Sequence, residues 1–365
     1  MTFLPALLRR EVSDFERELL SLPARMGGMG IYIPTEECGN AFRSSTIVSE
    51  PLVRLVLSQE SKFNPSEIAD EVLILRKQLD CDLDETHKEK FDRLNARGSV
   101  EAKRTLKLGR EKGASSWVTA APSYDHGTVL NKGEFVDAVC MRYGWDLADL
   151  PLNCVCGAAF NVQHALDCMI GGYRMIQHNE VRDLLAKSLR EAGMTAVETE
   201  PCLQPLSGER FELKSANKDD NARSDLKCVG FWSKMRQAYF DVKVVSPYAR
   251  SYDHMSSASL YRMAEKSKER EYKDRIRNVE HGDFNPIVFS TTGGMAPQCH
   301  LIVKRISDLI SDRNGIAKSV VSGWLRCRLS FALLRTTLLC VRGTRAKRVF
   351  HDSTIELVVS AAKMP

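Results

Sequence analysis

Two aspartates stand within short apolar runs of RSDLKCVGFWSKMRQAYFDVKVV, residues 223–245. A buried carboxylate lowers stability unless a cation or a set of hydrogen bonds compensates its charge. Asp225 and Asp241 fall in successive predicted strands, and Lys243 shares a face with Asp241 because side chains alternate along a strand. Converging carboxylates are ligands for Mg²⁺ or Mn²⁺, which lower the pKa of a bound water. With an ammonium group to stabilise charge on a phosphate, the triad predicts metal-dependent phosphodiester hydrolysis.

A structural interpretation of the same triad stays open. The triplet Asp-x-Lys is short enough to occur often by chance, and an aspartate at a strand end is commonly a cap or an ion-pair partner. The two interpretations differ in geometry. Carboxylates that share one cation must lie close together, whereas structural carboxylates can point to opposite faces of the sheet.

A second set of chemically capable residues lies in CVCGAAFNVQHALDC. Cys154, Cys156, His164 and Cys168 offer four zinc ligands in a compact knuckle. His164 and Cys168 are four residues apart, so a short helix would direct both toward one ion. The alternative is that these are buried free cysteines beside a core histidine. The type and spacing of the four residues favour Zn²⁺.

The elements that must position the triad follow an αβββαβ order. The helix HNEVRDLLAKSLREAG, residues 178–193, is predicted to start at an Asn179 N-cap and to end at Gly193. Apolar runs and helical periodicity predict strands at 195–200, 223–229, 238–246 and 285–294, and helices at 258–280 and 300–310.

The residues before the cysteine cluster are predicted to be mainly helical. Residues 1–60 contain helical patterns on either side of a glycine-rich turn, and the charged stretch 61–112 predicts an exposed helix pair or a linker arm. A strand or turn then precedes a helix over 132–143. Near the other end of the chain, LSFALLRTTLLCV, residues 329–341, is predicted to be a buried element.

Composition and charge limit the class of protein. The chain has 365 residues and a formal net charge of +5, which permits a polyanionic partner without requiring one. No run of about eighteen apolar residues is present, and the N-terminal apolar run is too short for a signal peptide. Eleven cysteines, an odd number, favour thiols or metal binding over a disulfide framework. We therefore expect a nuclear or cytoplasmic protein that is not secreted and does not bind membranes.

The two constellations in this order resemble the C-terminal region of non-LTR retrotransposons of the restriction-like-endonuclease class, which carry reverse transcriptases. In that family a Cys-Cys-His-Cys zinc module is followed directly by a PD-(D/E)xK nuclease. The stretches that carry the resemblance are LPARMGGMGI (22–31), GASSWVTAAP (113–122), LNKGEFVDAVCMRYGW (130–145), CVCG…HALDCMIGGY (154–173), QHNEVRD (177–183), RSDLKCVGFW (223–232), AYFDVKVVSPYA (238–249) and FNPIVFSTTGG (284–294). No Tyr/Phe-x-Asp-Asp polymerase motif occurs, so the resemblance covers what lies downstream of a polymerase palm.

The resemblance implies a restriction-endonuclease-like α/β fold and assigns roles to residues. Asp225 and Asp241 would hold Mg²⁺ or Mn²⁺, Lys243 would assist the attack, and Glu180 would supply the acidic residue of the preceding helix. Ser224 stands where the family pattern often has proline. The implied domains are a helical region at 1–112, a linker and zinc module at 113–173, the nuclease at 174–320, and an apolar and basic extension at 321–365.

The expected activity is divalent-metal-dependent endonucleolytic nicking of DNA by a mobile-element-derived protein, with element RNA as a further partner. The alternatives are a zinc-containing nucleic-acid-binding module with an inactive nuclease fold, a domesticated remnant, and a relic that merely folds. Lys268 and Tyr272, one turn apart, could reach the bond that is cleaved, but packing is the favoured interpretation. His178 could act near the metal, with a hydrogen-bonded structural histidine as the favoured interpretation. A stripe on the charged helix predicts contact with phosphates, or else a solvated face, and comprises Arg262, Lys266, Arg270, Lys273 and Arg277.

Overall fold

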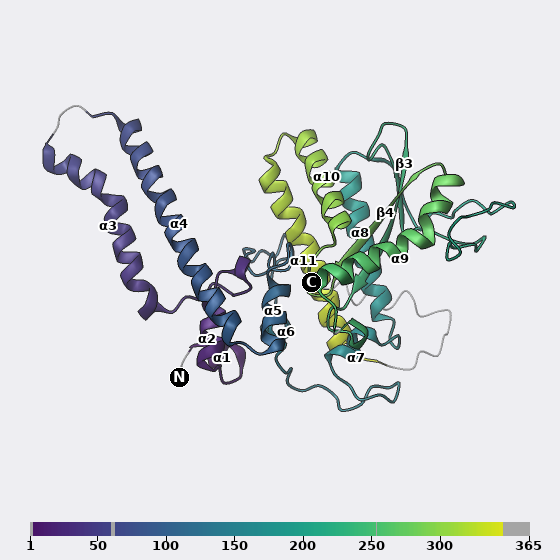
Figure 1. Ribbon diagram of the computed structural model, residues 1–365, viewed down its shortest axis with the longest axis horizontal. Helices are drawn as coiled ribbons and strands as arrows, with labels where there is room; N and C mark the ends of the chain where they lie inside the picture. The colour runs from purple at the N-terminus through teal and green to yellow at the C-terminus, as the bar shows by residue number, and fades with distance from the viewer. Residues whose placement is uncertain (1–2, 60–62, 253, 346–365) are drawn as a thin grey trace. The chain divides into compact units, whose positions relative to one another are not determined.

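The computed structural model describes residues 3–59, 63–252 and 254–345 (Figure 1). The described residues form a mixed α/β structure with eleven α-helices and one four-stranded sheet. The chain divides into two compact units. The N-terminal unit comprises residues 1–146, 292–295 and 326–330, and the C-terminal unit comprises residues 147–291, 296–325 and 331–365. None of the described helices combines the length and apolar character needed to cross a membrane.

The N-terminal unit is helical, as predicted. Its elements are α1 (Phe3–Leu8), α2 (Asp14–Ser21), the short 3-10 helix η1 (Ala24–Met26), α3 (Pro34–Ser58), α4 (Pro65–Arg97), α5 (Val100–Gly109) and α6 (Lys132–Tyr143). The helix predicted over 132–143 matches α6, because Asn131 forms a capping box with Glu134 at its start and Gly144 adopts a left-handed conformation at its end.

The end of α6 holds together two glycine-containing stretches of the N-terminal unit. Arg142 Nη2 donates a hydrogen bond to Ser115 Oγ at 2.8 Å and lies 3.3 Å from the carbonyl oxygen of Gly28. The buried hydroxyl of Tyr143 donates to the carbonyl oxygen of Gly27 at 3.0 Å. Three of the stretches that carry the family resemblance are therefore parts of one packed core.

The C-terminal unit contains the sheet. Its elements are α7 (Val162–Asp167), α8 (Tyr173–Glu191), β1 (Thr195–Thr199), β2 (Leu226–Val229), β3 (Gln237–Val245), η2 (Arg250–Tyr252), α9 (Ser257–Asn278), β4 (Asp283–Ser290) and α10 (Pro297–Asn314). Helix α11 (Lys318–Arg342) follows and contains the predicted buried run at 329–341. The predicted order of helix, three strands, helix, strand and helix is confirmed over α8 to α10.

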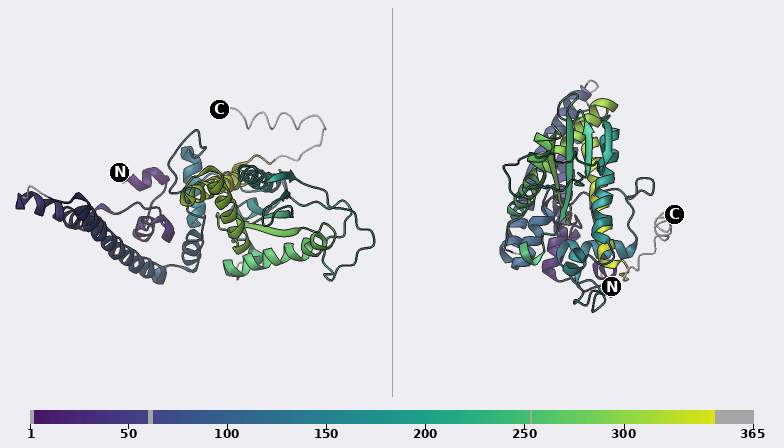
Figure 2. Two further views of the ribbon diagram at one scale, coloured as in Figure 1. Left: turned by 90° about the horizontal axis from the view of Figure 1, so that it is seen from above. Right: turned by 90° about the vertical axis from the view of Figure 1, so that its right-hand side faces the viewer.

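The sheet has the strand order β1-β2-β3-β4. Strands β1, β2 and β3 pair antiparallel, and β3 pairs parallel with β4 through the crossover helix α9. Helix α9 lies across one face of the sheet, and α8 and α10 pack on the other side (Figure 1). The left panel of Figure 2 shows α9 running alongside the strands.

Aromatic and aliphatic side chains pack between α9 and the sheet. Tyr239 on β3, which is 2% exposed, lies with Tyr272 and Ile276 of α9 in one buried cluster. Because alternate residues of a strand share a face, Asp241 and Lys243 project from β3 toward α9 as well. The fold therefore presents these two charged residues to the helix that crosses the sheet.

One predicted boundary is wrong. Helix α8 begins at Tyr173, and its N-cap is Gly172 in a left-handed conformation, so Asn179 lies within the helix instead of capping it. Glycine adopts positive φ at little cost and can start a helix without a side-chain cap. The other end is as predicted: Gly193 follows the C-cap residue with φ +81°.

The compact units and the predicted domains divide the chain at different points. The structure groups residues 113–146 with the helical region and begins the C-terminal unit at Leu147. The last part of the predicted C-terminal extension, residues 346–365, lies outside the described residues.

Candidate active site and candidate zinc centre

The register of β2 against β3 brings Asp225 beside Asp241. Leu226 pairs with Phe240 in this antiparallel ladder, so Asp225, one residue before β2, stands opposite Asp241. The backbone N–H of Val242 donates to Asp225 Oδ2 at 2.6 Å, which fixes that carboxylate against β3. Directly opposite residues of antiparallel strands point to the same face. Strand register therefore places the two carboxylates on the same face of the sheet, as binding of one shared cation requires.

Asp225 has a second partner on α8. His178 Nε2 lies 3.0 Å from Asp225 Oδ1, and both side chains are partly buried. The hydrogen bond to Asp225 raises the pKa of His178, and the charges of Asp225 and Asp241 add to that effect against the opposing effect of burial. An imidazole held in this way donates to the carboxylate and fixes its orientation.

Asp241 is the most buried acidic group of the site, with the residue 3% exposed. Burial and the charge of Asp225 together raise the pKa of Asp241 to about 7, even though Lys268 offsets part of the shift. Asp241 Oδ2 lies 3.0 Å from Lys268 Nζ but accepts no hydrogen bond of regular geometry from the described residues. The two carboxylates thus carry more negative charge than Lys268 neutralises.

Lys268 connects Asp241 to the rest of α9. Its ammonium group lies 3.2 Å from Glu271 Oε2 and 5.3 Å from the centre of the Tyr272 ring. Burial lowers the pKa of Lys268, but the carboxylates of Asp241 and Glu271 outweigh burial and raise it overall. Burial also raises the pKa of Tyr272 to about 12, with Asp241 contributing to the shift.

Lys243 completes the predicted triad from the same face of β3. Its side chain is half-buried, and burial lowers the pKa of Lys243, with a further contribution from the nearby charge of Lys268 and an opposing one from Asp241. The three residues predicted to carry the chemistry therefore lie in one electrostatic neighbourhood. Lys268 supplies a second ammonium group there.

Glu180 and His178 both lie on α8 but on nearly opposite sides of the helix, because two residues turn the chain by about 200°. The Glu180 side chain is exposed, so it is not the group of this helix that holds Asp225. His178, two residues earlier on the same helix, makes the contact instead. The sequence signal for Lys268 was its position one turn before Tyr272, which could equally well belong to a packed helix face.

The oxygen atoms that this site offers as ligands are suited to a hard divalent cation. Two carboxylates from adjacent strands provide oxygen ligands. The raised pKa of Asp241 reflects burial first and the charge of Asp225 second, and a bound cation would oppose both effects. Asp241 Oδ2, buried without a hydrogen bond of regular geometry, is an available ligand atom.

The four predicted zinc ligands converge. The ligand atoms of Cys154, Cys156, His164 and Cys168 all lie within 4.8 Å of one another. Cys154 Sγ is 3.8 Å from Cys168 Sγ, and Cys156 Sγ is 3.3 Å from His164 Nε2. A tetrahedral site with Zn–S bonds of about 2.3 Å has a sulfur–sulfur separation of about 3.8 Å. The cluster can therefore hold a zinc ion.

Local backbone structure preorganises these ligands. The N–H of Cys154 donates to the carbonyl oxygen of Ala158 at 2.8 Å, which closes a tight turn over the Cys-x-Cys segment. Asn161 caps α7, the short helix that carries His164. Burial raises the pKa of the Cys154 thiol, but hydrogen bonds from its neighbours outweigh burial and lower it to about 6. Thiolate is the form that binds zinc.

Comparison with known proteins gives no family assignment. A scan against protein-family models and a search of curated proteins found no match. The function of the chain is therefore inferred from its own residues.

The zinc cluster packs against the beginning of α8 and the end of α11. Arg345 donates from Nη2 to the carbonyl oxygen of Ala165 at 3.0 Å. Its guanidinium lies 5.0 Å from the ring centre of Phe160 and 5.2 Å from that of Tyr173. Because Tyr173 starts α8, the knuckle is mechanically connected to the helix that carries His178. This arrangement suits a structural metal centre that braces the sheet domain.

Proposed function

We propose that the C-terminal unit is a divalent-metal-dependent DNA endonuclease with a PD-(D/E)xK-type core. The observation that carries the proposal is the placement of Asp225 and Asp241 at opposite positions of adjacent strands, with Lys243 on the same face. The order α8, β1, β2, β3, α9, β4 and the antiparallel and parallel pairings agree with the expected αβββαβ core. The sequence resemblance to restriction-like endonucleases supports the same assignment.

Each residue of the site has a defined task in this proposal. Asp225 and Asp241 would hold Mg²⁺ or Mn²⁺, which when bound supplies Lewis acidity and an activated water. The ammonium groups of Lys243 and Lys268 stabilise negative charge on the phosphate as the phosphorus–oxygen bond breaks. His178 keeps the Asp225 carboxylate in place by its hydrogen bond.

The test is plasmid nicking by the purified chain in Mg²⁺ or Mn²⁺. The proposal expects supercoiled DNA to become open circles, and Asp225→Asn or Asp241→Asn to reduce the rate by about a hundredfold or more, equivalent to roughly 3 kcal/mol of barrier. Asp283→Asn is the matched control, because Asp283 lies in the same sheet but pairs with Arg236 at 2.8 Å. If the wild-type chain nicks no plasmid with either metal, the proposal is refuted.

A nucleic-acid-binding module without catalysis is the second candidate. It is favoured by the fact that each carboxylate already faces a basic side chain, Asp225 at His178 and Asp241 at Lys268. In that case these contacts would be the structural compensation of two buried acids. DNA binding by the wild-type chain without nicking, unchanged in Asp241→Asn, would support this candidate.

A further inference from the structure

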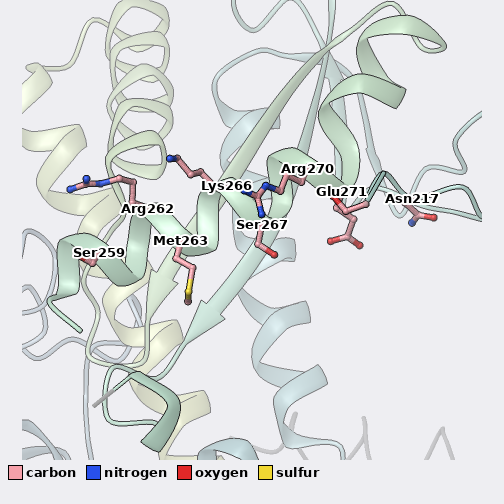
Figure 3. A pocket seen from close by; sticks show the side chains of 9 residues that line it. Asn217, Ser259, Arg262, Met263, Lys266, Ser267, Arg270 and Glu271 are labelled. Atoms are coloured by element: carbon pink, nitrogen blue, oxygen red, sulfur yellow. The ribbon is translucent and has the colours of Figure 1, made fainter. Parts of the chain in front are cut away.

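Helix α9 borders an open pocket of about 830 Å³ next to the candidate active site. The loop between β1 and β2 contributes Ser215 and Asn217 to the lining, and Figure 3 shows Asn217 beside Glu271 at one end of the row of α9 residues. The lining is polar and cationic, with one thioether and one carboxylate. It consists of Ser215, Asn217, Ser259, Arg262, Met263, Lys266, Ser267, Arg270 and Glu271.

Three basic residues of α9 give the pocket its charge. Arg262, Lys266 and Arg270 are exposed and follow one another at intervals of four residues. Figure 3 shows them projecting from one side of the helix. None of the three forms an ion pair with a described residue, whereas Lys273, further along the helix, lies 3.4 Å from a carboxylate oxygen of Glu269. The pocket cations are thus available to an anionic ligand.

The loop that supplies Ser215 and Asn217 is fixed to α9. Arg275 is fully buried, and its guanidinium donates to three backbone carbonyl groups of the loop, those of Asn217 (3.2 Å), Asp219 (2.6 Å) and Gln204 (2.9 Å). The N–H of Asn217 also donates to the carbonyl oxygen of Glu271 at 2.7 Å. A buried guanidinium that satisfies several carbonyl groups holds a loop firmly. The pocket is therefore a built feature of the fold.

One residue joins the pocket to the candidate active site. Glu271 lines the pocket and also lies 3.2 Å from Lys268, which in turn contacts Asp241. The lining holds three exposed cations and one carboxylate, so the pocket carries a net positive charge. The pocket and the candidate active site therefore share α9 and are linked through the contact of Glu271 with Lys268.

We propose that this pocket binds the phosphate backbone of duplex DNA. The inference rests on the proposed function for its choice of DNA as the polyanion. From Arg262 to Arg270 the helix rises about 12 Å, and phosphates of one DNA strand follow every 3.4 Å or so along the duplex axis. The cations thus match a run of about three to four phosphates. None of the nine lining residues is aromatic, so the pocket offers no stacking surface for bases.

The test is fluorescence anisotropy of a labelled DNA duplex with the wild-type chain and with Arg262→Gln/Lys266→Gln/Arg270→Gln, without added Mg²⁺ or Mn²⁺. Each lost phosphate contact should reduce the slope of log affinity against log salt by about 0.9, or about 2.7 for the triple variant. Affinity near 0.1 M salt should fall by about tenfold to a hundredfold. Scrambling the sequence of the duplex should leave the effect unchanged.

A matched variant removes the same charge outside the pocket. Lys187→Gln/Lys234→Gln/Lys304→Gln replaces three exposed cations of α8, the turn between β2 and β3, and α10 that do not line the pocket. We expect it to bind DNA with nearly the wild-type salt slope, and both variants to melt at the wild-type temperature. The proposal is overturned if the two triples weaken binding equally, if the pocket triple binds like the wild type, or if the wild-type chain binds no duplex DNA.

The same variants separate this inference from the proposed nuclease activity. Wild-type nicking together with binding that does not depend on the pocket would overturn only the pocket assignment. Pocket-dependent DNA binding without nicking in Mg²⁺ or Mn²⁺ would overturn the nuclease and leave the pocket assignment standing. An RNA duplex of the same sequence serves as a further probe, and an effect of the pocket triple on RNA alone would overturn the choice of DNA.

Discussion

His178 and Asp225 are 47 residues apart in the chain, yet Nε2 of the histidine lies 3.0 Å from Oδ1 of the aspartate. The contact joins α8 to the residue that precedes β2. Asp225 Oδ2 is held by the N–H of Val242, so both oxygens of the carboxylate have a partner. Such contacts to a ligating carboxylate typically change activity or metal affinity by about tenfold to a hundredfold when removed.

The first prediction follows from this contact. His178→Ala should reduce plasmid nicking by about tenfold to a hundredfold, because Asp225 loses the donor that orients it. His178→Gln should recover part of the rate, since its amide can still donate to the carboxylate. The rates are measured over a range of Mg²⁺ concentrations. Equal nicking by the alanine variant and the wild type would show that the contact is only structural.

Glu180→Gln provides the comparison on the same helix. Glu180 is exposed and lies on nearly the opposite side of α8 from His178, so its replacement should leave the nicking rate within about twofold of the wild type. The nuclease family that the sequence resembles has a functional acidic residue on this helix. In the structure it is His178 of this helix that contacts Asp225. A large loss in Glu180→Gln with little change in His178→Ala would reverse this assignment.

The second prediction concerns stability. Burial and the charge of Asp225 raise the pKa of Asp241 to about 7, which means that its ionised form is disfavoured in the folded chain. Asp241→Asn should therefore stabilise the protein at pH 8 by about 1–2 kcal/mol when no Mg²⁺ or Mn²⁺ is added. The measurement is thermal unfolding, where we expect a rise of several degrees.

A control in the same sheet makes this result specific. Asp283 is paired with Arg236 and is more exposed than Asp241, so Asp283→Asn should be neutral or slightly destabilising. A lower melting temperature for Asp241→Asn than for the wild type would show that the ion pair with Lys268 outweighs the burial of the charge. Asp241 would then be a structural residue.

The sequence predicted the helices and strands better than it predicted the contacts between their side chains. Strands β1 to β4 and helices α9 and α10 lie within a few residues of the predicted ranges, because apolar runs and helical periodicity are local signals. The start of α8 was missed because Gly172 replaces the side-chain cap that the prediction sought. The sequence marked Lys268 as able to reach the site but favoured packing, because solvated and sheet-facing positions look alike in a helix as charged as α9. The structure places Lys268 against Asp241.

The two metal-binding patterns differ in how much of their geometry the sequence could supply. The zinc ligands span only 154–168, so spacing alone predicted that they converge, and their convergence is confirmed. Asp225 and Asp241 meet only through the register of β2 against β3, which depends on the turn between them and on packing. The sequence could predict a shared face for Asp241 and Lys243 but not the side chain that would face Asp225.

The third prediction tests the zinc centre by metal content and stability. The wild-type chain should contain one zinc ion per chain by elemental analysis, and Cys168→Ser should lose it because three ligands bind zinc more weakly. The melting temperature should also fall by several degrees, since Arg345 packs the knuckle against Tyr173 at the start of α8. Cys202→Ser, an exposed cysteine outside the cluster, should keep both the zinc and the stability.

The last prediction concerns His87 in the N-terminal unit. His87 lies on α4, is 3% exposed, and stacks on Tyr32 with 6.1 Å between ring centres. Neither ring nitrogen has a hydrogen-bond partner in the described part of the chain. Burial lowers the pKa of His87, and the surrounding charges of Glu37, Arg25, Asp84 and Lys90 act in both directions and do not cancel that effect.

The sign of the resulting pH dependence follows from proton binding. The unfolded chain takes up a proton at this histidine near pH 6.5, whereas the folded chain does so only at lower pH. Above about pH 6.5, protonation of His87 therefore does not affect the free energy of unfolding. As the pH drops below about 6.5, that free energy decreases by up to about 1.4 kcal/mol per pH unit until the pH reaches the pKa of His87 in the folded chain. His87→Leu should show a shallower loss of melting temperature between pH 7.5 and 5.5 than the wild type. Parallel curves for the two proteins would mean that His87 does not contribute, since all other titrating groups are common to both.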